Sequence, residues 1–204
     1  MINPAEIEAI LFDMDGTLVD SDGAVERAWL TWATDYGVDG RAAIRLAHGS
    51  PSESTVRKLL PHLDEPAVLA AATRQLELQY DDLADVVPTP GAHDLVAALD
   101  ARGLPWAVVT SADARLAKAR LDAAGIVAPV LVTTDDIPAG KPDPAGYLKA
   151  AKMLGVAPAN CLVVEDAEVG LEAARAAGAY TAALRGLDGD LRLASLADLA
   201  AFLS

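Results

Sequence analysis

The chain has 204 residues, of which 52% are hydrophobic and 23% charged. This composition excludes a mostly disordered chain, a collagen-like repeat and a small disulfide scaffold. Thirty acidic residues against sixteen Lys and Arg give a net charge of −14, and a field of that sign repels nucleic acid and anionic lipid. We therefore expect no nucleic-acid or membrane partner, whereas a local cation can still attract a small anionic substrate into a cleft.

The cysteine content of the chain indicates a reducing compartment. Cys161 is its single cysteine, so it forms no internal disulfide, and the start of an apolar run predicts a packed core thiol there. The first residues are acidic where a signal peptide is basic, and no apolar run reaches the roughly 18 residues of a membrane span. We expect a cytoplasmic protein.

The first element is an apolar run at residues 7–12, which predicts a buried strand ending in the letters DMDGT. Residues 21–83 then have helical spacing with frequent Ala and Leu, and predict helices only. The segmentation we expect is an α/β core of residues 1–18 and 89–204 with an inserted all-helical cap of residues 19–88.

Two helix starts are predicted within this helical segment. Ser50, Pro51 and Glu53 have the spacing of an N-cap, a first helical residue and a capping box. Asp64 precedes a second helix in the same way.

Strands and helices alternate after the breaker letters PTPG that end at Gly91. The predicted strands are LPWAVVTS, residues 130–133, CLVVED and residues 180–184. The predicted helices are residues 92–102, residues 113–124 with Gly125 as C-cap, residues 145–154, a helix that ends near residue 177 and a helix that follows Ser195. Apolar strands alternating with helices indicate a doubly wound parallel sheet covered on both faces. Ligands of such sheets bind beyond the carboxyl ends of the strands.

Four acids lie at two of these strand ends, namely Asp13, Asp15, Glu165 and Asp166. Like charges brought close raise one another's pKa and destabilise the fold unless they are neutralised. Oxygen ligands without Cys or His suit a hard cation, and Mg²⁺ takes one or two carboxylates with waters and a phosphate. The set predicts a Mg²⁺ site, although any single member is equally explained as a solvated acid or a helix cap.

The spacing in DMDGT suits phosphoryl transfer through the protein. One carboxylate attacks phosphorus, and a second, two residues on, protonates the leaving oxygen and later takes a proton from water. Gly16 permits the sharp turn that follows. Thr17 either orients Asp15 or caps the next segment.

Two further residues have the chemistry to hold a phosphoryl group. Ser111 offers its hydroxyl and backbone amide at the start of a helix, where it also suits an ordinary N-cap. Lys141 lies between Gly and Pro in a loop, and its charge would neutralise both nucleophile and phosphoryl group. The three histidines are scattered, so a zinc site or a Ser-His-Asp triad has little support.

Taken together, the motifs resemble the haloacid dehalogenase superfamily, in its phosphatase branch with a helical cap after the first motif. The resemblance rests on DMDGT at Asp13, VVTSA around Ser111, GKPDP around Lys141 and VVEDAEVGLEAARAAG from Val163. It is greatest to phosphatases of sugar and polyol phosphates, through LVTTDDIPAGKPDPAGYLKAAKMLGV and the cap letters HGSPSESTVRKLLP, and it extends to β-phosphoglucomutase. A dehalogenase fits less well, because those relatives lack the acid at the place of Asp15.

The resemblance implies a role for each motif residue. Asp13 would be the nucleophile and Asp15 the acid/base, supported by Thr17. Asp13, Asp166 and the backbone carbonyl of Asp15 would hold Mg²⁺, with Glu165 behind them. The substrate and its phosphoryl group would contact Ser111, Ala112 and Lys141 of the core and His48 and Gly49 of the cap.

Relatives often carry an arginine shortly after the HG of the cap, where this chain has Ser50. Arg45 and Arg57 are candidates to replace it, and each is also explained as a solvated helix residue. Besides a phosphatase, the sequence leaves open a sugar phosphomutase, a receiver-type signalling domain and a catalytically silent binding protein. The oligomeric state and the particular phosphate ester are not encoded in these motifs.

Overall fold

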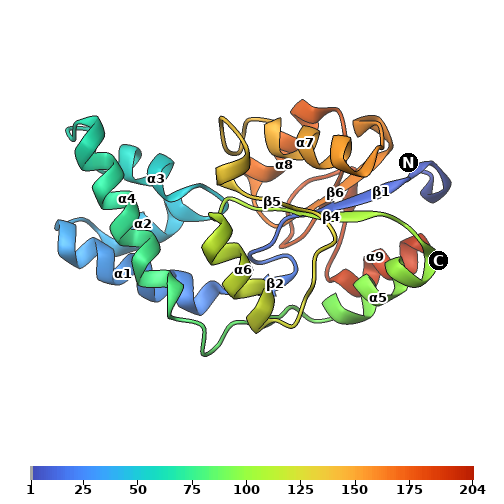
Figure 1. The fold of residues 1–204 in the computed structure, drawn as a ribbon, viewed down its shortest axis with the longest axis horizontal. Coiled ribbons are helices and arrows are strands. Elements are labelled where there is room, and N and C mark those ends of the chain that lie inside the picture. The colour runs from blue at the N-terminus through green and yellow to red at the C-terminus, as the bar shows by residue number, and fades with distance from the viewer. Residues whose placement is uncertain (1) are drawn as a thin grey trace.

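The structure is a computed structural model that describes residues 2–204. Its central feature is a six-stranded sheet in the order β5-β4-β1-β6-β7-β8 (Figure 1). The strands are β1 (Ala9–Phe12), β4 (Trp106–Val109), β5 (Leu131–Val132), β6 (Cys161–Glu165), β7 (Tyr180–Ala183) and β8 (Leu191–Arg192). All neighbouring pairs are parallel, which confirms the predicted α/β fold with a parallel sheet.

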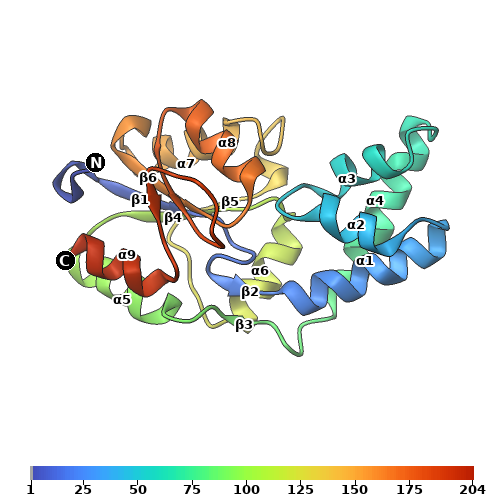
Figure 2. The same cartoon turned by 180° about the vertical axis from the view of Figure 1, so that it is seen from behind.

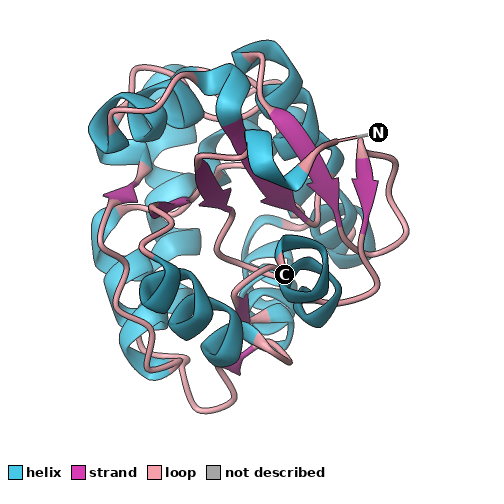
Figure 3. Cartoon of the chain, turned by 90° about the vertical axis from the view of Figure 1, so that its right-hand side faces the viewer, coloured by secondary structure: helices cyan, strands magenta, loops and turns pink. Residues whose placement is uncertain are grey.

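Helices cover both faces of this sheet, as Figure 3 shows from the side. Alternate strand residues such as Ile10 and Phe12 pack against α5 (Ala92–Arg102), α6 (Ala114–Ala123) and α9 (Leu196–Leu203). Their neighbours Ala9 and Leu11 pack on the other face against α7 (Ala145–Leu154) and α8 (Glu168–Ala177). Strands buried on both faces explain why their sequences are apolar throughout.

Four helices form a second layer with its own hydrophobic cluster, and we call them the cap. They are α1 (Asp22–Tyr36), α2 (Gly40–Ala47), α3 (Ser52–Leu59) and α4 (Glu65–Tyr80). Trp32 is their centre: its ring packs edge-on to Trp29 and stacks on Tyr36, and its indole N–H donates to the carbonyl of Ala71 at 2.8 Å. Figure 2 shows the cap to one side of the core, with β2 (Val19–Asp20) lying between the main sheet and α1.

Three short strands were not predicted. β2 (Val19–Asp20) pairs antiparallel with β3 (Val87–Pro88), so that the two connections between core and cap run side by side. β8 extends the edge of the main sheet. Unlike β5, which lies in a longer apolar segment, these two-residue strands lie in mixed polar and apolar segments and have no readable period. None of the helices within residues 2–204 is long and apolar enough to cross a membrane.

Two predicted helix ends are wrong in detail. α3 begins at Ser52 with Pro51 at the N-cap, and Ser50 instead donates its amide to the Ala47 carbonyl at 2.9 Å. Glu53 pairs with Arg57 at 2.7 Å, so the predicted capping box does not form. The C-cap of α6 is Ala124 rather than Gly125, which follows it with a φ of +66°. The predicted start at Asp64 is confirmed by its bond from the Ala67 amide at 3.0 Å.

Candidate active site

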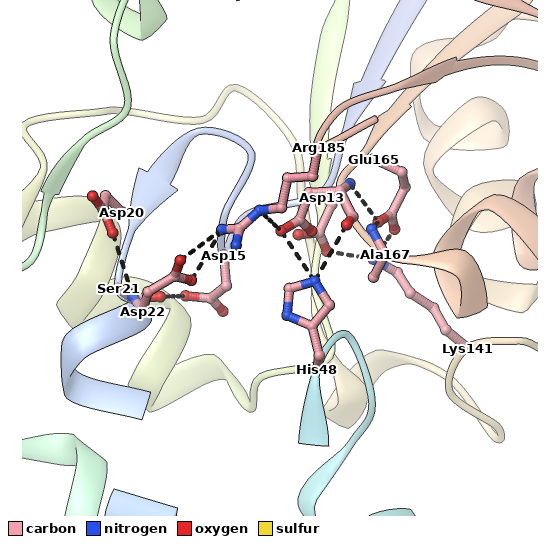
Figure 4. Close-up of polar contacts among 11 residues, drawn as sticks. Asp13, Asp15, Asp20, Ser21, Asp22, His48, Lys141, Glu165, Ala167 and Arg185 are labelled. Carbon is pink, nitrogen blue, oxygen red and sulfur yellow. Dashed lines mark hydrogen bonds and ion pairs between the residues drawn. The ribbon is translucent and has the colours of Figure 1, made fainter. Parts of the chain in front are cut away.

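Several of the predicted site residues lie near one another beyond the carboxyl ends of the central strands, and Figure 4 shows Asp13, Asp15, His48, Lys141 and Glu165 among them. Asp13 directly follows β1, and its amide donates to the Val164 carbonyl of the neighbouring β6 at 2.9 Å. Glu165 is the last residue of β6, and Asp166 comes next. Because parallel strands end at one edge of the sheet, this register places the three carboxylates level with one another.

A buried lysine neutralises part of this acidic group. The Lys141 ammonium donates to the Asp13 carboxylate, to Glu165 Oε1 at 2.6 Å and to the Val109 carbonyl at 3.1 Å. Burial disfavours its charge, but the two carboxylates outweigh burial and hold the pKa of Lys141 above its usual value. Glu165 Oε1 also accepts the Tyr147 hydroxyl at 2.6 Å. Glu165 Oε2 accepts the amides of Asp166 at 3.2 Å and Ala167 at 3.3 Å, so both oxygens of this carboxylate have partners within the protein.

The same carboxylates suit a hard divalent cation. Asp13, Glu165 and Asp166 each offer one oxygen, and these oxygens lie within 4.8 Å of one another. Burial raises the pKa of Asp13, and it raises the pKa of Asp166 to about 6. Asp166 Oδ2 is buried without a hydrogen-bond partner among the described residues, although the Arg185 Nε lies 2.8 Å away as an ion pair. Arg185 therefore already provides a positive charge to Asp166, and the cluster of carboxylate oxygens has the ligand chemistry that a hard divalent cation requires.

Asp15 is held apart from this cluster. Its Oδ1 accepts the Ser21 hydroxyl at 2.6 Å and the Arg120 Nη1 at 2.8 Å. The bond expected from Thr17 is not formed: its hydroxyl is buried and has no partner among residues 2–204. Ser21 and Arg120 were missed by sequence reasoning, although Arg120 lies four residues after Leu116 on the buried face of α6. That position was the available signal.

The loop after β4 does not cap its helix with Ser111. α6 begins at Ala114 with Asp113 as N-cap, so Ser111 and Ala112 lie in the preceding loop. The Ser111 hydroxyl donates to the Gly49 carbonyl of the cap at 3.1 Å. Gly49 has a φ of +68°, and a Cβ there would lie 2.4 Å from the Ala167 Cβ. Only glycine allows the cap backbone to come so close to the core.

His48 brings an imidazole from the cap to the acids. Its Nε2 lies 3.2 Å from the Asp166 carbonyl and 3.4 Å from Asp166 Oδ2. Between cap and core lies a cavity of about 90 Å³, which we call the site cavity. The predicted residues that line it are Asp13, Asp15, His48, Gly49, Ser111 and Ala112.

Neither arginine considered as a replacement for the absent cap arginine reaches the site cavity. Arg45 is exposed. Arg57 is engaged on the outside of the cap, where it pairs with Glu53 at 2.7 Å and with Glu65 at 2.6 Å. Arg120 of the core lines the cavity instead.

Gly170 in α8 makes room for Glu165, because a Cβ at this position would lie 1.8 Å from Glu165 Oε1. Gly170→Ala is expected to destabilise the fold by about 1–3 kcal/mol, since the carboxylate cannot move without leaving its buried partners. Urea unfolding measures this free energy. Gly23→Ala in α1 is the control: its Cβ meets the Asp85 side chain, which is exposed and is held by Arg27 at the surface, so that it can shift into solvent. Equal stability of Gly170→Ala and wild type would contradict the packing described.

Comparisons with known proteins agree with this geometry. Residues 7–178 match the haloacid dehalogenase-like hydrolases. The chain is 39% identical over 178 residues to hexitol phosphatase A of Escherichia coli (strain K12), covering 87% of this chain and 82% of that protein. It is 33% identical over 189 residues to 2-deoxyglucose-6-phosphate phosphatase 1 of Saccharomyces cerevisiae, covering 84% and 77%.

A solved structure shares the same fold. CbbY from Rhodobacter sphaeroides, in complex with phosphate, superposes with a TM-score of 0.82 at 26% identity, covering 97% of this chain and 99% of that one. The four motifs, the sheet order and these matches span most of the described residues, and they confirm the resemblance read from the sequence. The chain belongs to the haloacid dehalogenase-like hydrolase family.

Proposed function

We propose that the protein is a Mg²⁺-dependent phosphatase of a small phosphorylated metabolite, a sugar or polyol phosphate, and that it acts through an aspartyl phosphate on Asp13. The observation that carries this proposal is the pairing of buried Asp13 with Lys141, together with the position of Asp13 and Asp15, which both line the site cavity. This is a nucleophile with a neutralising cation and a second acid within reach of a leaving group.

The chemistry takes two steps. The Asp13 carboxylate attacks phosphorus, and the ester P–O bond breaks while Asp15 gives its proton to the leaving oxygen. Asp15 then takes a proton from water, which attacks the aspartyl phosphate, releases phosphate and restores Asp13. Lys141 and the Ser111 hydroxyl hold the phosphoryl oxygens, with Ala112 beside them. Thr17, two residues after Asp15, is fully buried and would support this segment by packing.

Asp13, Asp166 and the backbone carbonyl of Asp15 would hold the Mg²⁺. When bound, the cation neutralises the acids and the phosphoryl oxygens. Glu165 supports the site from behind, because its carboxylate already binds Lys141 and Tyr147. The clustering of the Asp13, Glu165 and Asp166 carboxylate oxygens within 4.8 Å of one another supports a cation at this place.

In this proposal the core of residues 1–18 and 89–204 carries the chemistry, and the cap of residues 19–88 encloses the substrate. The cavity is small, and polar cap side chains such as Ser52 and Gln79 line it, which suits a hydroxylated substrate. His48 and Gly49 would contact that substrate. The names of the hexitol and deoxyglucose phosphate relatives support the same class. The strongly acidic chain is consistent with a cytoplasmic enzyme without a nucleic-acid partner.

Phosphate release across phosphorylated sugars, polyols, nucleotides and glycolate tests this function. We expect release from a few sugar or polyol phosphates in the presence of Mg²⁺, and loss of that activity with EDTA. Restoring Mg²⁺ in excess over EDTA is the control for damage by the chelator. Conversion of a hexose 1-phosphate to its 6-phosphate without free phosphate would identify a mutase instead. Equal release with and without EDTA would contradict the role of the metal.

A further inference from the structure

Arg120 on α6 is buried, and the other arginines among residues 2–204 are not. Burying a guanidinium is costly, and an apolar side chain packed in its place is often equally stabilising. The flanking residues on this face of α6, Leu116, Ala117 and Leu121, are apolar as expected. Stability alone therefore does not account for a charge at this position.

The first hydrogen-bond partner of Arg120 is Asp15. Its Nη1 donates to Asp15 Oδ1 at 2.8 Å, and the Ser21 hydroxyl donates to the same oxygen at 2.6 Å. No described residue donates to Asp15 Oδ2. Two bonds on one oxygen fix the orientation of the carboxylate and leave its second oxygen free for proton transfer.

The second contact leads into the cap. Arg120 Nη2 donates to Gln79 Oε1 at 2.5 Å, in the last turn of α4. Gln79 Nε2 donates to Gln75 Oε1 at 2.7 Å, and that oxygen also accepts the Ser52 hydroxyl of α3 at 2.6 Å. A continuous row of hydrogen-bonded side chains thus runs from Asp15 through the core helix into two helices of the cap.

We propose that Arg120 is a positioning residue for Asp15, and that its bond to Gln79 makes this positioning depend on the cap. The inference rests on the proposed function, in which Asp15 is the acid/base. With the cap seated, the planar guanidinium is anchored at both ends and holds Asp15 in one orientation. When the cap moves away, Gln79 leaves and Arg120 loses one anchor. Proton transfer is thereby favoured while the cavity is covered and bulk water is excluded.

Steady-state kinetics of Arg120→Met and Gln79→Met, with the best substrate of the phosphate-release panel, test the proposal. Arg120→Met is expected to lower kcat about 10²-fold with little change in KM, because Asp15 is misplaced rather than removed. Gln79→Met, which loses one hydrogen bond, is expected to lower kcat about 2- to 10-fold. Arg120→Lys keeps the charge but cannot bridge both partners, so it restores only part of the rate.

The decisive experiment measures the double variant Arg120→Met/Asp15→Asn against Asp15→Asn alone. Because Asp15→Asn already removes the carboxylate that Arg120 positions, adding Arg120→Met is expected to lower kcat no further. Arg115→Met is the matched control: Arg115 lies on the same helix, 3.9 Å over the Tyr80 ring of the cap, and wild-type kcat is expected. Urea unfolding of each variant identifies any rate loss that comes from misfolding, and Gln79→Met still tests the link if Arg120→Met does not fold.

Three results would overturn the proposal: a wild-type kcat in both Arg120→Met and Gln79→Met, a loss confined to KM, or a full additional loss in the Asp15→Asn background. A failure of the proposed function looks different. In that case the wild-type protein releases no phosphate, or Asp15→Asn by itself keeps the wild-type rate.

Discussion

Asp13→Asn is expected to abolish turnover, lowering kcat by a factor on the order of 10⁴–10⁶, because an amide cannot attack phosphorus. The fold is expected to survive. The substitution is nearly isosteric, and it removes one of three neighbouring carboxylates while Lys141 keeps its bond to Glu165 at 2.6 Å. Phosphate release measures the rate, and circular dichroism with urea unfolding measures the fold.

Asp135→Asn is the matched control for this variant. Asp135 is an exposed acid after β5, in the letters VTTDD where a receiver-type domain would place its phosphorylated aspartate. We expect wild-type turnover from it. A folded Asp13→Asn protein with near wild-type rates would show that the nucleophile is assigned to the wrong residue.

Asp15→Asn is expected to slow hydrolysis of a sugar phosphate about 10²–10⁴-fold, since a poor leaving group needs a proton as the ester bond breaks. A substrate such as 4-nitrophenyl phosphate has a leaving group that departs without this proton. Its first step should be much less affected, so the pre-steady-state release of nitrophenol separates bond cleavage from the later hydrolysis. Comparing the two substrates therefore tests the acid role specifically.

The control for Asp15→Asn is Asp20→Asn, which removes an exposed carboxylate five residues along the same segment. The Asp20 carboxylate accepts a hydrogen bond from the Asp22 amide at 3.4 Å. Its replacement is therefore expected to affect only the start of α1. An equal loss of the first step for both substrates in Asp15→Asn would contradict its assignment as the acid.

The sequence predicts most of the core of this fold, because its signals are local. Strand β6 has four apolar residues followed by Glu165, and Asp166 comes directly after it, so the sequence predicts both the strand and the acidic end that carries the site. The helix from Ala145 to Leu154 was predicted with its observed bounds, since Pro144 and Gly155 punctuate it. Short strands such as β2 have no such period.

The part of the site that sequence reasoning missed depends on tertiary contact. Asp15 is oriented by Arg120, which is 105 residues away, and nothing in the local letters indicates which buried arginine meets which acid. The expected partner, Thr17, is a neighbour in sequence, but its hydroxyl is buried and makes no hydrogen bond to Asp15. Spacing along a chain identifies the groups that carry chemistry, whereas packing decides how they are held.

The cap shows the same limit. The letters after His48 suggested a capping box around Ser50, but Glu53 pairs with the guanidinium of Arg57 instead, because a charged partner is stronger than a backbone amide. Neither candidate cap arginine lines the cavity: Arg45 is exposed, and Arg57 is paired with Glu53 and Glu65. The buried arginine at the cavity comes from the core.

The most direct test of the proposed chemistry is to look for the phosphoryl group on the protein during turnover. Enzyme mixed with Mg²⁺ and its best substrate is quenched in acid within milliseconds, digested and analysed by mass spectrometry. We predict a phosphorylated peptide that contains Asp13, absent in Asp13→Asn and decaying rapidly once substrate is exhausted. Turnover without any label at Asp13, or a long-lived label on Asp135 or Asp136, would contradict it.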